Sequence, residues 1–263
     1  MFEKNNVWNS RLRNLIILLI FLKISVGYAF AQVNQSKITQ GDAICIESNS
    51  IPDHKVGTFP NRANPHSIRE QRIKLCVSSN PKKNSKPQFI KGTIGIALNG
   101  IQFRPNTAGS YDPSSKSGHS RNGDKRWTLD IFGAKNRLGL DMNNGHVGPN
   151  GLYHYHGIAE SLIWNPESSF IGYAGDGFEI HFVGRKVRSG YTLRSGERPS
   201  GPGGAFDGTF NEDYVYSHDH ETLDQCNGGQ LNGKYVYFIT LDYPFIGRCL
   251  WGDIAPGFGA DRH

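Results

Sequence analysis

The stretch "GLYHYHGIAE" (residues 151–160) places two histidines and two tyrosines at four consecutive positions. If residues 152–157 form a strand, His154 and His156 point to one face and Tyr153 and Tyr155 to the other. Same-face residues two apart lie about 6–7 Å apart at Cα, a spacing that lets two imidazoles converge on one ion. The pattern predicts a strand with a metal-binding face and an aromatic core face. The alternative is a core strand whose histidines are half-exposed.

The rest of the chain favours short strands and turns. It contains 32 glycines, 13 prolines and 11% aromatic residues. The segment "IGIALNGIQF" (94–103) alternates apolar residues around an Asn-Gly pair, a strong hairpin signal. The segment "FIGYAGDGFEIHF" (170–182) has the same form around Asp-Gly. We therefore expect an all-β, mainly antiparallel domain, either a sandwich or an irregular barrel with long loops.

Other segments complete this expectation. Strands are expected over 126–133 and 235–241, and a short helix over 157–164. Residues 32–44 are expected to be a flexible leader, and residues 110–125 and 194–210 to be loops, because they are polar or rich in glycine and proline.

The first 31 residues have the features of a targeting signal. Basic residues precede the apolar run "LIILLIFL", and Ala29-Phe30-Ala31 forms an A-x-A cleavage pattern. We expect cleavage before Gln32, which leaves one domain over 32–263 that is secreted or periplasmic. The alternative is a signal anchor, but Lys23 interrupts the run, which falls short of the roughly 20 apolar residues that a span needs. No later segment is apolar enough to cross a membrane.

Removal of that segment, with four basic residues and one acidic residue, lowers the formal net charge from +6 to +3. The remaining basic residues are scattered. A nucleic-acid partner is therefore not expected, since it would require a concentrated basic stripe.

All four cysteines lie after the predicted cleavage site, and four cysteines allow three pairings. Export favours disulfides, and we expect pairing between nearest neighbours. A cysteine-ligated metal site is the competing interpretation, but no C-x-x-C spacing supports it. The expected disulfides are Cys45–Cys76 and Cys226–Cys249.

Further ligands for the predicted metal site are available nearby. The segment "GLDMNNGHVGPNG" (139–151) offers His146 and Asp141. Asp176 is a third candidate, either as a ligand or as an acceptor that fixes a histidine tautomer, although Asp before Gly is also ordinary turn chemistry. Histidine and carboxylate ligands suit Zn²⁺ or Cu²⁺.

The remaining histidines are not expected to contribute. His218-Asp219-His220 lies in a polar segment, and His54, His66 and His119 stand alone in turn-rich stretches, where they are expected to be solvated.

Motifs that would define a reaction are missing from the sequence. It has no G-x-S-x-G elbow, P-loop, H-E-x-x-H or dinucleotide fingerprint. Whether the chain is an enzyme therefore stays open. A metal-binding protein with possible metal-dependent activity is the main hypothesis. The alternative is a non-catalytic module that recognises glycan or a surface protein through Trp127, Trp164 and Trp251.

The segment "NNGHVGPNGLYHYHG" (143–157) resembles the signature of the YHYH-domain proteins, a family of exported and mostly uncharacterised proteins. Residues 51–71, 94–103, 172–182, 191–216 and 223–249 also resemble family segments. The resemblance implies a site at Asp141, His146, His154, His156 and Asp176. His181 departs from the pattern, and "YVYF" (235–238) lacks histidines that some relatives repeat there. A site built from two such strands would be incomplete.

Overall fold

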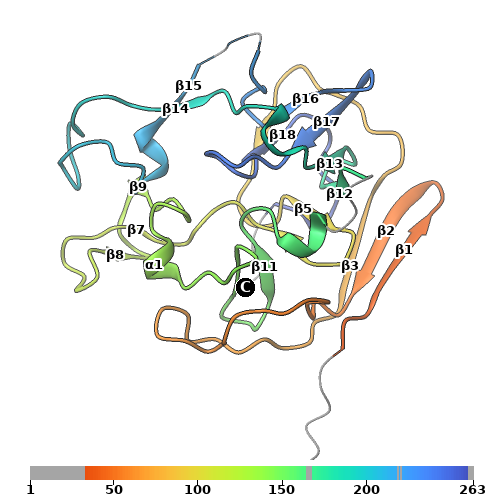
Figure 1. Cartoon of the computed structure of the whole chain (residues 1–263), viewed down its shortest axis with the longest axis horizontal. Coiled ribbons are helices and arrows are strands. Elements are labelled where there is room, and N and C mark those ends of the chain that lie inside the picture. Colours follow the sequence, from red (N-terminus) through yellow and green to blue (C-terminus); the bar gives the residue numbers. More distant parts are fainter. Residues whose placement is uncertain (1–32, 164–167, 218, 220, 260–263) are drawn as a thin grey trace, which may run out of the picture. The chain divides into compact units, whose positions relative to one another are not determined.

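The structure is a computed structural model that describes residues 33–163, 168–217, 219 and 221–259. An eight-stranded sheet organises them (Figure 1). Five of its seven strand pairs are antiparallel, and β11–β6 and β13–β17 are parallel. From edge to edge the sheet runs β10 (Gly145–Val147), β11 (Tyr153–Tyr155), β6 (Gln102–Phe103), β5 (Gly95–Ala97), β12 (Phe170–Ala174), β13 (Glu179–His181), β17 (Lys234–Phe238) and β16 (Gly228–Leu231).

Smaller sheets surround this one. They are β1 (Ser36–Gln40), β2 (Ala43–Ser48) and β3 (Ile73–Ser78); β7 (Ser110–Tyr111), β8 (His119–Ser120) and β9 (Asp124–Thr128); β4 (Gln88–Phe89) with β18 (Cys249–Leu250); and β14 (Tyr191–Leu193) with β15 (Tyr214–Tyr216). Helical turns are short: α1 (Lys135–Leu138) and the 3₁₀ turns Glu160–Ile163, Gly184–Lys186 and Asn211–Asp213. The all-β, mainly antiparallel expectation is confirmed. None of the described sheets closes into a barrel.

Both predicted hairpins form, as β5–β6 and β12–β13. Their two inner strands, β5 and β12, pair at the centre of the sheet. Glycine is required there. A Cβ on Gly172 would lie 2.4 Å from the carbonyl oxygen of Ile96, and a Cβ on Gly95 would lie 2.8 Å from that of Tyr173. The close approach of the two strands leaves no room for a side chain at these positions.

Four local expectations were wrong. Residues 32–44 contain β1 and the start of β2, which pair with each other. The 110–125 loop contains β7 and β8, and 157–164 has a 3₁₀ turn where a helix was expected. The strand expected over 126–133 ends at Thr128, since the Asp130 carboxylate accepts the backbone N–H groups of Phe132 and Gly133 at 3.0 and 2.9 Å and turns the chain.

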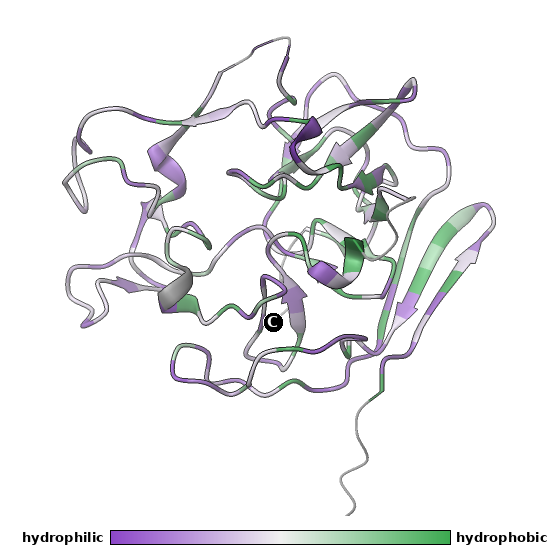
Figure 2. Cartoon of the chain, in the orientation of Figure 1, coloured by the Kyte–Doolittle hydropathy of each residue, from purple (hydrophilic) through white to green (hydrophobic). Residues whose placement is uncertain are grey.

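The core lies on the large sheet. Tyr153 and Tyr155 are fully buried there, together with Phe103 of the neighbouring strand. A second cluster lies between this sheet and the β2–β3 pair, and Figure 2 shows the hydrophobic stretch on β2. The aromatic face predicted for the tyrosines is therefore a core face.

Both expected disulfides are present. Cys45 and Cys76 are directly opposite each other on β2 and β3, and Cys226 joins the segment before β16 to Cys249 on β18. All four cysteines are paired.

No helix in the described part of the chain is long and apolar enough to span a membrane. The described residues all belong to one unit that begins at Gln32. The signal peptide expected over 1–31 lies outside the described residues and stays a prediction.

Candidate metal centre

The hairpin of β10 and β11 brings three histidines together. His146 on β10 lies directly opposite His154 on β11. His156 follows β11, and its backbone N–H donates to the carbonyl of Asn144 at 2.8 Å, which holds it against the start of β10. The alternation predicted for the strand puts the two histidines on one face, and strand pairing adds the third.

The three rings form an even triangle. Each pair of ring centroids, His146–His154, His146–His156 and His154–His156, is separated by 4.8 Å. One nitrogen from each ring lies within 4.8 Å of the other two. Two of these nitrogens, Nε2 of His146 and Nε2 of His156, are 3.1 Å apart. Ligand nitrogens around a tetrahedral zinc ion are separated by roughly 3.3 Å, given a Zn–N distance of about 2.0–2.1 Å. The spacing of the His146 and His156 nitrogens is therefore close to that of two ligands on one zinc ion.

Backbone carbonyls fix the tautomers of two rings. Nδ1 of His146 lies 2.8 Å from the carbonyl oxygen of Leu138, and Nδ1 of His154 lies 3.1 Å from that of Leu152. A carbonyl can only accept, so Nδ1 carries the proton in both rings and Nε2 keeps its lone pair. This arrangement is usual for histidines that bind metals.

The third ring contains a polar atom without a partner. Nδ1 of His156 is buried and has no hydrogen-bond partner in the described part of the chain. Because Nδ1 of His146 carries the proton, Nε2–H of His156 donates to Nε2 of His146 at 3.1 Å, and Nδ1 of His156 is left with a lone pair that nothing binds. A buried acceptor without a partner is costly unless something binds it. A cation held by the three rings is one way to satisfy it.

The surroundings keep the three rings neutral. His154 and His156 are buried, and His146 is half-buried. Burial is the main cause that lowers the pKa of all three histidines, and the positive charge of Arg104 lowers it further. Arg104 follows Phe103, which pairs with Tyr155, so it occupies the register position beside His156. Neutral imidazole is the form that binds a metal.

Asp141, one of the predicted ligands, is not part of the convergent cluster. Its carboxylate accepts the backbone N–H groups of Asn143 and Gly145 at 2.9 and 3.1 Å, and the hydroxyl of Tyr153 at 2.8 Å. The N–H of Gly57 donates to it as well, at 3.1 Å. Asp141 therefore shapes the turn that carries His146.

Asp176 lies elsewhere in the fold, in the turn between β12 and β13. Its carboxylate accepts the hydroxyl of Tyr237 at 2.7 Å and the backbone N–H of Gly252 at 2.8 Å. It fixes no histidine tautomer, since carbonyl groups do so at His146 and His154. Asp176 also has a structural role in its own turn.

His54, which was expected to be solvated, belongs to the scaffold beneath the site. Its Nε2 lies 2.6 Å from the hydroxyl of Tyr155, and its ring stacks on that tyrosine at 5.8 Å between centroids. The amide of Asn143 lies 3.0 Å from its Nδ1. The sequence offered no signal for this, because 101 residues separate His54 from Tyr155.

None of the other described histidines belongs to the cluster, although the charge of His66 helps to lower the pKa of His146. His181 is buried on β13 and lies 2.8 Å from the carboxylate of Glu179 and 2.9 Å from the hydroxyl of Ser169. His218 and His220 of the expected surface segment lie outside the described residues.

The fold and site together define a disulfide-linked β-sheet protein with three histidines on one hairpin. A family model described as "YHYH protein" matches residues 74–252, more than half of the chain. The chain therefore belongs to the YHYH family, as the sequence resemblance indicated. No curated protein and no solved structure matches it.

Proposed function

We propose that this chain is an exported metal-binding protein in which His146, His154 and His156 hold Zn²⁺ or Cu²⁺. The observation that carries the proposal is the convergence of three neutral imidazoles, two of them buried and one half-buried, with a nitrogen of each within 4.8 Å of the others. Both disulfides support export, since such bonds persist in oxidising compartments.

Three protein ligands leave room for a fourth. Metal sites with three histidines commonly complete their coordination with water, and a bound zinc ion then supplies a nucleophile near neutral pH. His146 is the least buried of the three ligands, so the route for a solvent molecule or substrate lies on its side. Metal-assisted hydrolysis is the reaction class that this donor set would serve.

The alternative, a glycan- or protein-binding module, would require several aromatic side chains exposed together. Trp127 is buried and Trp251 is half-buried, while Trp164 lies outside the described residues. Phe89 is the one exposed aromatic residue in the described part. These observations favour the metal site.

The test is elemental analysis of the purified protein after loading with Zn²⁺ or Cu²⁺ and removal of free metal. We expect about one metal ion per chain in the wild type and little in the His154→Ala/His156→Ala variant. The His119→Ala variant is the matched control and should retain its metal, because that histidine is on β8, outside the cluster of three histidines. Equal, near-zero metal in the wild type and the double variant would overturn the proposal.

A further inference from the structure

The strand order of the large sheet is the same when counted from either edge. The four strands β10-β11-β6-β5 pair as antiparallel, parallel and antiparallel. The four strands β16-β17-β13-β12 pair in the same sequence. At the centre, Ile96 of β5 pairs with Tyr173 of β12. The pairs on either side, Gly95 with Ala174 and Gly172 with Ala97, are exchanged when β5 and β12 are exchanged. The sheet therefore has a local two-fold arrangement centred on this pair.

The turns that enter the two outer hairpins have matching hydrogen bonds. Residues 141–145 and 224–228 each begin with aspartate. In the second turn the Asp224 carboxylate accepts the N–H groups of Cys226 and Gly228 at 2.9 and 2.8 Å, as Asp141 does two and four residues later in its own turn. The fourth residue is asparagine in both, with φ of 55° at Asn144 and 59° at Asn227.

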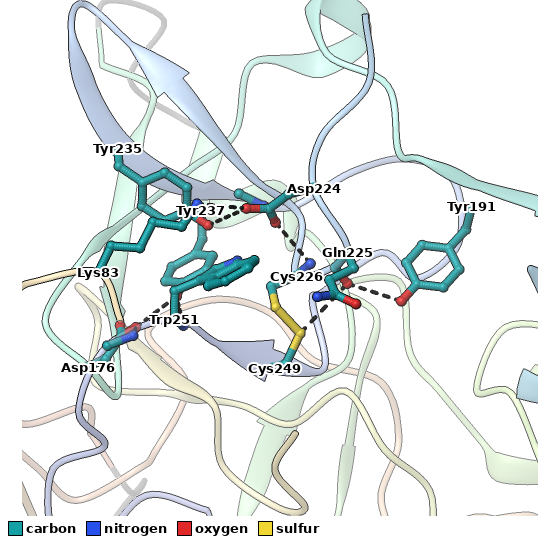
Figure 3. The surroundings of a disulfide bond; sticks show 12 residues. Lys83, Asp176, Tyr191, Asp224, Gln225, Cys226, Tyr235, Tyr237, Cys249 and Trp251 are labelled. Carbon is teal, nitrogen blue, oxygen red and sulfur yellow. Dashed lines mark hydrogen bonds and ion pairs between the residues drawn. A yellow bond between two sulfur atoms is a disulfide. The ribbon is translucent and has the colours of Figure 1, made fainter. Parts of the chain in front are cut away.

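The tyrosines match as well. The hydroxyl of Tyr235 donates to Asp224 at 2.7 Å (Figure 3), just as the hydroxyl of Tyr153 donates to Asp141 at 2.8 Å. Two residues later, the Tyr237 hydroxyl donates to Asp176 in the β12–β13 turn (Figure 3). At the equivalent place, the Tyr155 hydroxyl accepts from Asn99 in the β5–β6 turn at 3.0 Å. Both inner turns then have a glycine with positive φ, 82° at Gly100 and 94° at Gly177.

The strand register identifies the residues of the second hairpin, β16–β17, that occupy the positions equivalent to the three histidines. On the first hairpin, Gly145 pairs with Tyr155 and His146 with His154. On the second, Gly228 pairs with Tyr237 and Gly229 with Val236. The equivalents of His146, His154 and His156 are therefore Gly229, Val236 and Phe238. Even the backbone bond at the third position is repeated, because the N–H of Phe238 donates to the carbonyl of Asn227 at 2.8 Å.

We infer that the sheet consists of two copies of one four-stranded unit and that the second copy is a divalent-metal site whose three histidines are replaced by an apolar cluster. Leu223, Val236 and Phe238 pack together where the ligands would stand. The same scaffold of Asp, Asn, Gly and two Tyr residues persists with no histidine at the three ligand positions. The tyrosines of the YHYH motif therefore serve the fold, and its histidines serve the ligand. The metal part of this inference rests on the proposed function, whereas the repeat itself does not.

A side chain added at Gly229 would meet only other side chains. A Cβ on Gly229 would lie 2.9 Å from Cδ2 of Leu223 and 3.4 Å from the ring of Phe238. The first contact is with the end of a flexible side chain. The second contact is removed when Phe238 itself is replaced by the smaller histidine.

The test grafts the histidines onto the second unit as Gly229→His/Val236→His/Phe238→His. Zn²⁺ bound per chain is measured by elemental analysis, and folding by circular dichroism. We expect the metal content to rise from about one to about two ions per chain. In the His154→Ala/His156→Ala background, the graft should restore about one ion. The variant with glutamine at the same three positions is the matched control and should bind no additional Zn²⁺.

A folded graft that binds no more Zn²⁺ than the wild type would overturn the inference. If the triple graft does not fold, Val236→His/Phe238→His, which keeps Gly229, decides the matter through additional Zn²⁺ at higher concentration. Failure of both grafts to fold also counts against it, since these positions are claimed to accept imidazoles. A wild type that binds no metal would instead overturn the proposed function. The repeat would then be tested by His146→Gly/His154→Val/His156→Phe, which should fold with a Tm close to that of the wild type.

Discussion

His146 and His154 face each other across the β10–β11 ladder with their ring centroids 4.8 Å apart, and each donates Nδ1–H to a backbone carbonyl. Strand pairing and main-chain hydrogen bonds thus orient the lone pairs before any ligand arrives. A preorganised donor set of this kind loses little entropy when it binds an ion.

Removal of a single ligand should therefore weaken binding sharply. For His146→Ala we expect Zn²⁺ affinity to fall by at least about 100-fold, because loss of even an outer-shell partner commonly costs 10–100-fold. Competition with a chelator of known affinity measures the change. The His119→Ala variant should bind as the wild type does, and a less than threefold change for His146→Ala would exclude this histidine from the site.

Asp141→Asn separates the fold from the ligand set. The carboxylate accepts hydrogen bonds from Tyr153 and from three backbone N–H groups, so its replacement should lower the free energy of unfolding by about 1–3 kcal/mol. Chemical denaturation measures this loss. The folded variant should still bind one Zn²⁺ per chain, and loss of the metal from a fully folded Asp141→Asn protein would place the carboxylate among the ligands.

The repeated tyrosine–aspartate bond gives a matched pair of variants. Tyr153→Phe and Tyr235→Phe each remove one hydroxyl that donates to a turn aspartate. A hydrogen bond to a charged group contributes about 1.5–3 kcal/mol, and we expect both variants to lose a similar amount within that range. Denaturation curves compare them, with metal content as the second readout. A large loss for one variant and none for the other would show that the two turns are not equivalent.

Acid should release the metal only below the ordinary pKa of histidine. Burial lowers the pKa of all three rings below 6.5, so they stay unprotonated as the pH falls through that value. Protons compete with the metal at lower pH. We expect the midpoint of Zn²⁺ release to lie below pH 6.5, as measured by metal content after equilibration across a pH series.

In the metal-free protein, the lowered pKa of the three histidines should make the free energy of unfolding depend on pH. Its unfolded histidines take up protons near pH 6.5 while the buried ones do not, so the free energy of unfolding should fall as the pH drops below 6.5. The variant with glutamine at His146, His154 and His156 should lose this part of the acid sensitivity. Identical pH profiles for the two metal-free proteins would contradict the burial effect.

The sequence predicted the parts of the fold that depend on local pattern. Alternation and turn residues identified both inner hairpins, and the H-x-H spacing placed His154 and His156 on one face. Nearest-neighbour pairing of cysteines was also correct. These features depend on residues close together in the chain, where backbone geometry decides which side chains meet.

Features set by long-range contacts were not predictable from the sequence. Asp141 and Asp176 were chosen as ligand candidates because carboxylates bind metals. Their carboxylates instead accept hydrogen bonds from the hydroxyls of Tyr153 and Tyr237, and these donors are brought close only by the fold. The stacking of His54 on Tyr155 depends on a contact between residues that are 101 positions apart in the chain. The repeat was only hinted at by "YHYH" and "YVYF", since register, more than residue identity, carries the equivalence.

The disulfide at Cys226 allows a final prediction, because this residue is the counterpart of Asn143 in the repeated turn. Cys226 forms a disulfide with Cys249 (Figure 3). The amide of Asn143 is instead hydrogen-bonded to the carbonyl of Lys55 and to the ring of His54. Closing a loop of this size contributes about 3 kcal/mol. Cys226→Ser/Cys249→Ser should therefore lower the free energy of unfolding by about that amount and leave Zn²⁺ binding unchanged, since no ligand lies in the second unit. Cys45→Ser/Cys76→Ser is the control for loss of a disulfide elsewhere, and thiol titration of the denatured wild type should find no free cysteine. Loss of Zn²⁺ from a folded Cys226→Ser/Cys249→Ser protein would mean that metal binding in the first unit depends on the second unit.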